Sequence, residues 1–175
     1  MNKDNIPVYC LTQLADYDYQ YNFTRIEPVW NSFGFTLKKS IIPEQKQFKD
    51  GTFSYGLYFD GTTLKKRALY YGLTNALAKG RNLDEPFIII SSHNVIVAPI
   101  DLGLYENIGD VMILGKDNFI DNGLIIKPNA ADKLFKLFLN TMIDNRPVNS
   151  FISDVCKGNN INFKYSNIEV VEPLI

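Results

Sequence analysis

The sequence predicts an α+β fold in one globular domain, residues 1–175, with a mainly antiparallel sheet of about seven or eight short strands against two or three helices. Two observations predict it. Short alternating or wholly apolar runs are joined by short turns, which favours antiparallel pairing. Two longer segments repeat apolar residues at helical spacing. At 175 residues, with 46% hydrophobic side chains, the chain can fold without a metal or disulfide.

The first expected strand covers residues 16–23, because aromatic side chains occupy every second position. In an extended backbone, alternate side chains point to opposite faces of the strand. One face would carry the aromatic residues Tyr17, Tyr19, Tyr21 and Phe23, and the other would carry Asp16 and Asp18. A second strand is expected over residues 52–59, where Phe53, Tyr55 and Leu57 alternate with small or polar residues.

A helix is expected from Thr63 to Lys79, with Gly80 as its stop signal. Its apolar stripe consists of Leu69, Leu73, Ala76 and Leu77. The following strands are expected at residues 87–90, 95–98, 111–114 and 124–127, the first pair being joined by the turn 91–94. These segments make up the central part of the predicted sheet.

A second helix is expected from Ala130 to about residue 144, with Asn129 as its N-cap. Its predicted apolar face consists of Ala131, Leu134, Phe135, Phe138 and Met142. A short helix over residues 150–156 and two strands, 161–165 and 168–171, complete the expected elements.

Composition limits the classes of function. The formal net charge of −1 argues against nucleic acid as a partner, since nucleic-acid-binding domains are usually basic. Cys10 and Cys156 lie far apart and are expected to be reduced thiols. The N-terminus lacks the apolar core of a signal peptide, and no apolar run has the length of a membrane span. We therefore expect a soluble, cytoplasmic protein with no membrane partner.

No catalytic or metal-binding motif stands out. Cys10, the single histidine His93 and Asp101 can be written as a hydrolase triad, but no nucleophile signature surrounds Cys10. Without such a signature, the simpler interpretation is that Cys10 is a buried apolar residue and His93 a turn residue. No ligand spacing indicates a metal, and no cofactor is expected.

The segment that links the 52–59 strand to the first helix is a candidate anion site. It contains Thr62, Thr63, Lys65, Lys66 and Arg67. Three cations in the first turn of a helix oppose its dipole, and such a conflict can mark a functional site. A helix N-terminus with hydroxyl and lysine side chains can bind phosphate, although the P-loop motif is absent. The alternative interpretation is a later helix start with solvated cations.

The preferred functional interpretation is a non-catalytic protein-binding module. Asp16, Tyr17, Asp18, Tyr19 and Tyr21 would form its contact surface, because tyrosines anchor interfaces and carboxylates attract a basic partner. This profile resembles, in type only, bacterial immunity or inhibitor proteins that neutralise a nuclease-like toxin. The alternatives are a small hydrolase using Cys10, His93 and Asp101, a phosphate or nucleic-acid site at residues 60–67, and a phage or mobile-element scaffold protein.

Overall fold

The computed structural model describes residues 6–13, 17–44, 56–116, 118–166 and 168–174 of the chain. The strands in this part are β1 (Val8–Thr12), β2 (Leu37–Ile41), β3 (Tyr58–Phe59), β4 (Phe87–Ser91), β5 (Asn94–Ile96), β6 (Val111–Ile113), β7 (Leu124–Ile126), β8 (Met142–Ile143), β9 (Phe163–Tyr165) and β10 (Val171–Pro173). The helices are α1 (Tyr17–Ser32), α3 (Leu64–Gly80), α4 (Leu102–Glu106), α5 (Phe119–Asn122), α6 (Pro128–Asn140) and α7 (Val148–Gly158).

Six strands form one mixed sheet in the order β2-β1-β4-β7-β6-β9. The pairs β1–β2, β1–β4 and β6–β9 are parallel, whereas β4–β7 and β6–β7 are antiparallel. The prediction of a mainly antiparallel α+β sheet is therefore wrong. Helix α1 connects β1 to β2, and α3 lies between β2 and β4, so helical crossovers bring these strands together in parallel. The sequence prediction had missed both β1 and β2.

The predicted strand over residues 16–23 is also wrong, because α1 begins at Tyr17. Asp16 lies outside the described residues. Phe23, Ile26 and Trp30 are all buried, and their spacing of three and four residues is that of one helix face. The alternation of the first few aromatics was thus part of a longer helical period. Only a window extending to Trp30 distinguishes the two patterns.

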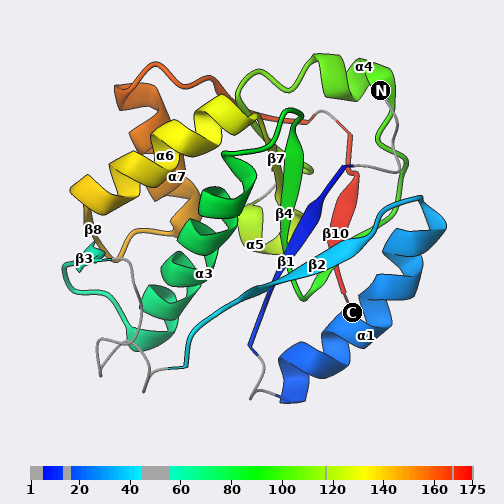
Figure 1. Cartoon of the computed structure of the whole chain (residues 1–175), viewed down its shortest axis with the longest axis horizontal. Helices are drawn as coiled ribbons and strands as arrows, with labels where there is room; N and C mark the ends of the chain where they lie inside the picture. The colour runs from blue at the N-terminus through cyan, green and yellow to red at the C-terminus, as the bar shows by residue number, and fades with distance from the viewer. Residues whose placement is uncertain (1–5, 14–16, 45–55, 117, 167, 175) are drawn as a thin grey trace.

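Helices cover both faces of the sheet, with α3, α6 and α7 on one side and α1 and α4 on the other (Figure 1). Strand β4 is apolar at every position before its terminal serine, because it is buried on both faces. Phe87 and Ile89 pack into the core beneath α3 and α6, whereas Ile88 and Ile90 pack into the core beneath α1. A strand buried on both faces needs apolar residues at successive positions, as the sequence predicted for residues 87–90.

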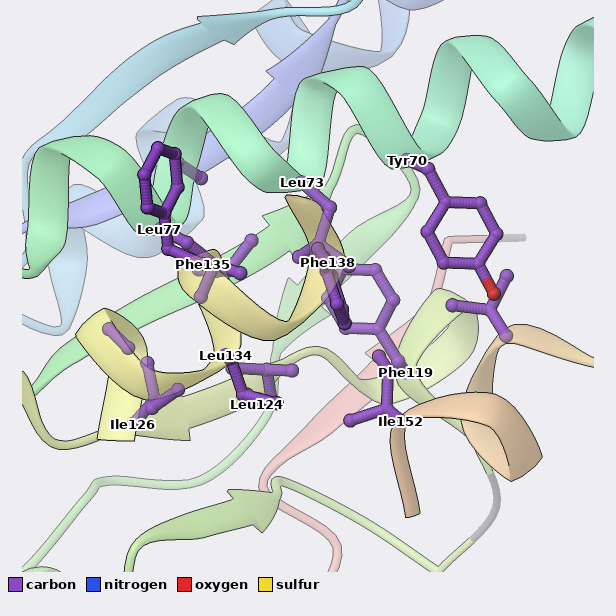
Figure 2. Close-up of a cluster of buried hydrophobic side chains, with 14 of the residues drawn as sticks. Tyr70, Leu73, Leu77, Phe119, Leu124, Ile126, Leu134, Phe135, Phe138 and Ile152 are labelled. Carbon is purple, nitrogen blue, oxygen red and sulfur yellow. The ribbon is translucent and has the colours of Figure 1, made fainter. Parts of the chain in front are cut away.

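The core beneath α3 and α6 is formed mainly where these two helices meet, as Figure 2 shows. Leu73 and Leu77 of α3 lie beside Phe135 and Phe138 of α6 in this view. Gly80 allows α3 to approach the sheet closely, because a Cβ atom there would lie 1.9 Å from the Phe87 ring. Gly80 is therefore a packing residue within the helix, and Arg81 is the C-cap. The predicted role of Gly80 as a stop signal is corrected accordingly.

Other predicted elements are confirmed with shifted bounds. The helix expected from Thr63 begins after that residue, whose side chain caps it. The helix expected from Ala130 begins at Pro128 with Lys127, not Asn129, as N-cap, and it ends at Asn140. Met142 lies in β8 with 56% of its surface exposed, so it is not part of the helix face.

The remaining strand predictions need correction in their pairing. The strand expected at residues 95–98 is β5, which pairs with β10 and not with β4. The two C-terminal strands do not pair with each other, since β9 joins β6 in the main sheet. Of the strand expected over residues 52–59, residues 52–55 lie outside the described part and β3 covers its end. None of the described helices is long and apolar enough to cross a membrane.

Candidate functional site

A cavity of about 310 Å³ lies at the edge of the sheet where the parallel strands β1 and β4 end. Helices α1 and α3 both begin at this edge (Figure 1). The apolar part of the wall is formed by Leu11, Ile42, Leu69, Ile120 and Val148. Such a wall suits an apolar part of a ligand better than a fully charged group.

The polar part of the wall gathers side chains from three elements and the β4–β5 turn. They are Tyr19, Thr63, Lys65, Lys66, Ser91 and His93. A second hollow of about 530 Å³ adjoins the first, because Tyr19, Ile42, Lys65 and His93 line both. Asp18 also lines this second hollow. We refer to the two connected hollows as the strand-end cavity.

The five residues of the predicted anion site separate into two groups. Thr63, Lys65 and Lys66 line the strand-end cavity. Thr62 is buried and accepts a hydrogen bond of 2.9 Å from Nε of Arg67, whose guanidinium also lies over the Phe59 ring. Arg67 is therefore engaged beside Thr62 and Phe59 and is not a lining residue.

The two lysines in the cavity wall differ in their contacts. Nζ of Lys66 donates to the carbonyl oxygens of Asn145 and Arg146, both at 2.9 Å, and so ties the start of α3 to the segment after β8. Lys65 is exposed and has no hydrogen bond or ion pair with another described residue. Lys65 is thus the cation available to a ligand, while Lys66 positions the helix.

His93 lies between the two hollows and is oriented by α1. Nδ2 of Asn22 is 3.0 Å from Nδ1 of His93, and the Tyr19 ring centre is 6.1 Å from that of His93. When the Asn22 amide donates to Nδ1, the neutral imidazole carries its proton on Nε2. His93 can then donate a hydrogen bond from Nε2 to a ligand oxygen.

The turn that carries His93 is held by its own polar side chains. Oδ1 of Asn94 accepts from the Ser91 amide at 2.8 Å, and Nδ2 of Asn94 donates to the Ile120 carbonyl at 2.7 Å. Oγ of Ser91 donates to the same carbonyl at 3.0 Å. Trp30 of α1 adds a hydrogen bond from Nε1 to the Asn94 carbonyl. These contacts fix the end of β4 and engage the polar side-chain groups of Ser91 and Asn94.

The hydrolase alternative is not supported by the geometry. Cys10 is completely buried in the core beneath α1, and this burial raises the pKa of its thiol. The thiol is therefore protonated and closed to a substrate. The Asp101 carboxylate accepts from the Leu104 amide at 2.8 Å as the N-cap of α4. Cys10, His93 and Asp101 consequently do not act as a triad.

The predicted partner-binding surface is divided by the helical backbone of α1. Asp18 and Tyr19 line the strand-end cavity. Tyr21 is 49% exposed, with the Arg25 guanidinium 5.5 Å from its ring centre. Tyr17 is the first residue of the helix. The structure thus brings part of one predicted site, Asp18 and Tyr19, beside part of the other, Lys65 and Lys66.

Sequence reasoning missed the residues that complete this cavity, above all Leu11 and Ile42 at the ends of β1 and β2. The signal that could have found them is the apolar run at residues 8–11, followed by a helical period and then by a segment at 37–42 that begins with Leu37 and ends with Ile41 and Ile42. Recognition of that strand–helix–strand order would have placed their carboxyl ends at one edge. In the described part of the chain, no group of three or more His, Cys, Asp or Glu residues is placed to hold a metal.

A sheet with helices on both faces and a cavity at the ends of its parallel strands defines an α/β fold of the Rossmann type. Searches find no matching family model and no matching curated protein. Among solved structures, the chain is similar to a mutant of Drosophila β-1,4-galactosyltransferase 7 in complex with manganese, UDP-Gal and xylobiose. The TM-score is 0.54 at 10% identity, over 97% of this chain and 71% of that one.

This similarity establishes the fold, which is of the GT-A-like α/β kind. It contradicts the preferred interpretation of the sequence, a bacterial immunity protein or toxin inhibitor, because the solved structure with a similar fold is a galactosyltransferase. The described part of the acidic and tyrosine-rich segment that suggested such an inhibitor, from Tyr17 onward, is the start of α1. Part of it belongs to a cavity wall.

Proposed function

We propose that the protein is glycosyltransferase-like and binds a nucleotide sugar in the strand-end cavity. The observation that carries the proposal is the position of the cavity at the carboxyl ends of parallel strands, with Lys65 in its wall. Open α/β sheets bind their ligands outside these strand ends. The similarity to a galactosyltransferase that holds UDP-Gal supports the same assignment.

The lining matches the two kinds of chemistry in a nucleotide sugar. Lys65 and Nε2 of His93 offer donors to the negatively charged diphosphate. The apolar wall, with Leu11 and Ile42 at its base, offers contact surface to a base or sugar ring. The volume of the first hollow lies at the lower end of the range typical of small-molecule sites, and the second hollow extends it.

In the proposed reaction, an acceptor hydroxyl oxygen forms a bond to the anomeric carbon of the sugar. The bond between that carbon and the phosphate oxygen breaks, and the nucleoside diphosphate leaves with the electron pair. Lys65 would stabilise the charge that develops on the leaving phosphate. We assign the hydroxyl proton to the Asp18 carboxylate, which lines the second hollow.

The test is a titration of the protein with UDP-, GDP-, ADP- and dTDP-sugars, followed by measurement of nucleoside diphosphate release with sugar acceptors. We expect one nucleotide class to bind and to be turned over. The Asp18→Asn variant should bind it with unchanged affinity and release product at least about a hundredfold more slowly. Failure of every nucleotide sugar to bind would contradict the proposal.

A second candidate is a protein that binds a nucleotide sugar without transferring the sugar. It is favoured by the turn after β4, where the Ser91 and Asn94 side chains are engaged in local hydrogen bonds. The same titration separates the two candidates. Binding without release of nucleoside diphosphate, for every acceptor offered, would support the second.

A further inference from the structure

The manganese in the galactosyltransferase complex raises the question of how this chain would neutralise a diphosphate. We infer, on the basis of the proposed function, that the strand-end cavity holds the diphosphate through the Lys65 ammonium and without a divalent cation. Two independent features of the cavity lead to this inference: its oxygen ligands do not fit a metal, and its wall supplies a cation of its own.

The end of β4 offers no suitable ligand set. The last residue of β4 is Ser91, and Ser92, His93 and Asn94 follow it in the turn to β5; none of the four is a carboxylate. The Asn94 side chain is used on both sides, by the Ser91 amide and by the Ile120 carbonyl. Oγ of Ser91 donates to that same carbonyl. Hard divalent cations prefer several oxygen ligands, carboxylates above all, so this turn does not provide a metal site.

The rest of the described wall does not compensate. Asp18 is the one carboxylate among the described residues that line the two hollows. No group of three or more His, Cys, Asp or Glu side chains in the described ranges comes close enough together to hold an ion. A single carboxylate leaves most coordination positions of a manganese ion to water or substrate.

The positive charge is instead supplied by the protein. Lys65 lines both hollows and makes no hydrogen bond or ion pair with another described residue. Its neighbour Lys66 is held by the Asn145 and Arg146 carbonyls at 2.9 Å, which fixes the first turn of α3 and therefore the position of Lys65. A lysine beside a diphosphate replaces one charge of a bound cation and needs no metal loading.

The inference is tested by isothermal titration calorimetry, first in EDTA and then with excess Mn²⁺. The titrant is the nucleoside diphosphate that corresponds to the nucleotide sugar with the highest affinity. We expect dissociation constants that agree within about twofold in the two conditions. In EDTA, Lys65→Met should weaken binding about tenfold to a hundredfold, the loss typical of a charged hydrogen bond. Lys133→Met is the matched control, since Lys133 is an exposed lysine on α6 outside the cavity wall. The affinity of this variant for the nucleoside diphosphate should equal that of the wild type.

The outcomes are distinguishable. Binding that requires Mn²⁺ would overturn the metal-free inference and leave the proposed function standing. Absence of binding in both conditions would overturn the inference together with the proposed function. Equal affinity of Lys65→Met and the wild type in EDTA would show that another group holds the diphosphate. Circular dichroism and thermal unfolding of both lysine variants establish that any loss of affinity occurs in a folded protein.

Discussion

The main sheet has a parallel half, strands β2, β1 and β4, and an antiparallel half around β7, the strand that runs opposite to its neighbours β4 and β6, and the two differ at the edge where β1, β2 and β4 end. In the parallel half, strands β1 and β2 end at this edge, and α1 and α3 begin beside a cavity. In the antiparallel half, β7 begins at the same edge directly after α5, and buried side chains fill the space. Asn122 illustrates this filling, because it is fully buried and donates to the Val171 carbonyl at 2.6 Å.

The comparison teaches that the connections, more than the strands, decide where a ligand can bind. A helical crossover begins at the carboxyl ends of the strands and carries the chain back to the opposite edge of the sheet. The strand ends therefore stay open between two helix starts. A short connection between antiparallel neighbours closes the edge with its own residues. We therefore expect substitutions in the cavity wall of the parallel half to change ligand affinity more than stability. Substitutions at strand ends that are closed by packed side chains should mainly change stability.

The largest expected effect concerns the contact between α3 and the sheet. In Gly80→Ala, the added methyl group would meet the buried Phe87 ring at 1.9 Å. Overpacking typically costs about 1–3 kcal/mol of unfolding free energy, and we expect about 3 kcal/mol here because the contact is with a buried ring. Urea unfolding of Gly158→Ala is the control, because no atom lies within 4 Å of the new Cβ there and stability should stay within about 1 kcal/mol. Equal stability of the two variants would contradict the close packing of α3.

The next effect concerns the closed end of β4. Asn94→Ala removes the partner of the buried Ser91 amide and one of the two side-chain donors to the Ile120 carbonyl. We expect a loss of about 2 kcal/mol in unfolding free energy, since the buried Ser91 amide is left without a partner. Asn140→Ala, which removes an exposed hydrogen bond on α6, should cost less than about 0.5 kcal/mol. A similar loss in both variants would mean that the turn is not held by Asn94.

The buried thiols lie one in each core and predict a dependence of stability on pH. Burial raises the pKa of Cys156 to about 12, above that of a thiol in the unfolded chain. The folded state then binds the proton more tightly, so stability is fully present below the unfolded pKa and is lost as pH rises through the folded one. We expect unfolding free energy to fall by about 1–2 kcal/mol for this thiol between neutral pH and about pH 10.

Chemical denaturation at several pH values measures this loss, and Cys156→Ala should show a smaller fall. Cys10, whose pKa is raised by the same cause, should resist iodoacetamide in the folded protein and react after unfolding. Rapid labelling of Cys10 at neutral pH would contradict its place in the core beneath α1. The pH dependence of unfolding therefore tests the thiol in the core beneath α3 and α6, and the labelling tests the thiol in the core beneath α1.

The smallest expected effect separates the two lysines of the parallel half. Lys66→Met removes hydrogen bonds to the Asn145 and Arg146 carbonyls, all at an exposed site. It should cost about 0.5–1 kcal/mol in stability, because water can replace these partners. Its effect on nucleotide affinity should be smaller than that of Lys65→Met, because Lys66 acts through the position of the helix. A larger loss of nucleotide affinity in Lys66→Met than in Lys65→Met would mean that Lys66 binds the ligand and Lys65 does not.

Much of the fold could be predicted locally, and the failures have physical causes. The helix from Thr63 and the buried strand at residues 87–90 were predictable, because their apolar periods are long or unbroken. Strand pairing was not, since a parallel partner such as β2 is set by a distant crossover and not by adjacent turns. The segment 16–23 misled because its alternation satisfies a strand period over a window too short to exclude a helix.

The candidate site was predictable only in pieces. The local conflict of cations at the start of α3 drew attention to Lys65 and Lys66, and both line the cavity, while their role in binding an anion stays a prediction. His93 was noticed as the single histidine, but its neighbours Tyr19 and Asn22 come from α1, far away in the sequence. Their meeting depends on the tertiary packing of α1 against the β4–β5 turn, which no local pattern encodes.

The most direct test of the central claim is to locate the bound ligand on the protein. Backbone amide shifts of the ¹⁵N-labelled protein, measured with and without a nucleotide sugar, report which half of the sheet responds. The account predicts the largest changes at Lys65, Lys66 and His93, at the ends of the parallel strands. Changes confined to the hollow beside β9, lined by Lys164 and Tyr165, would contradict it, as would the absence of any change.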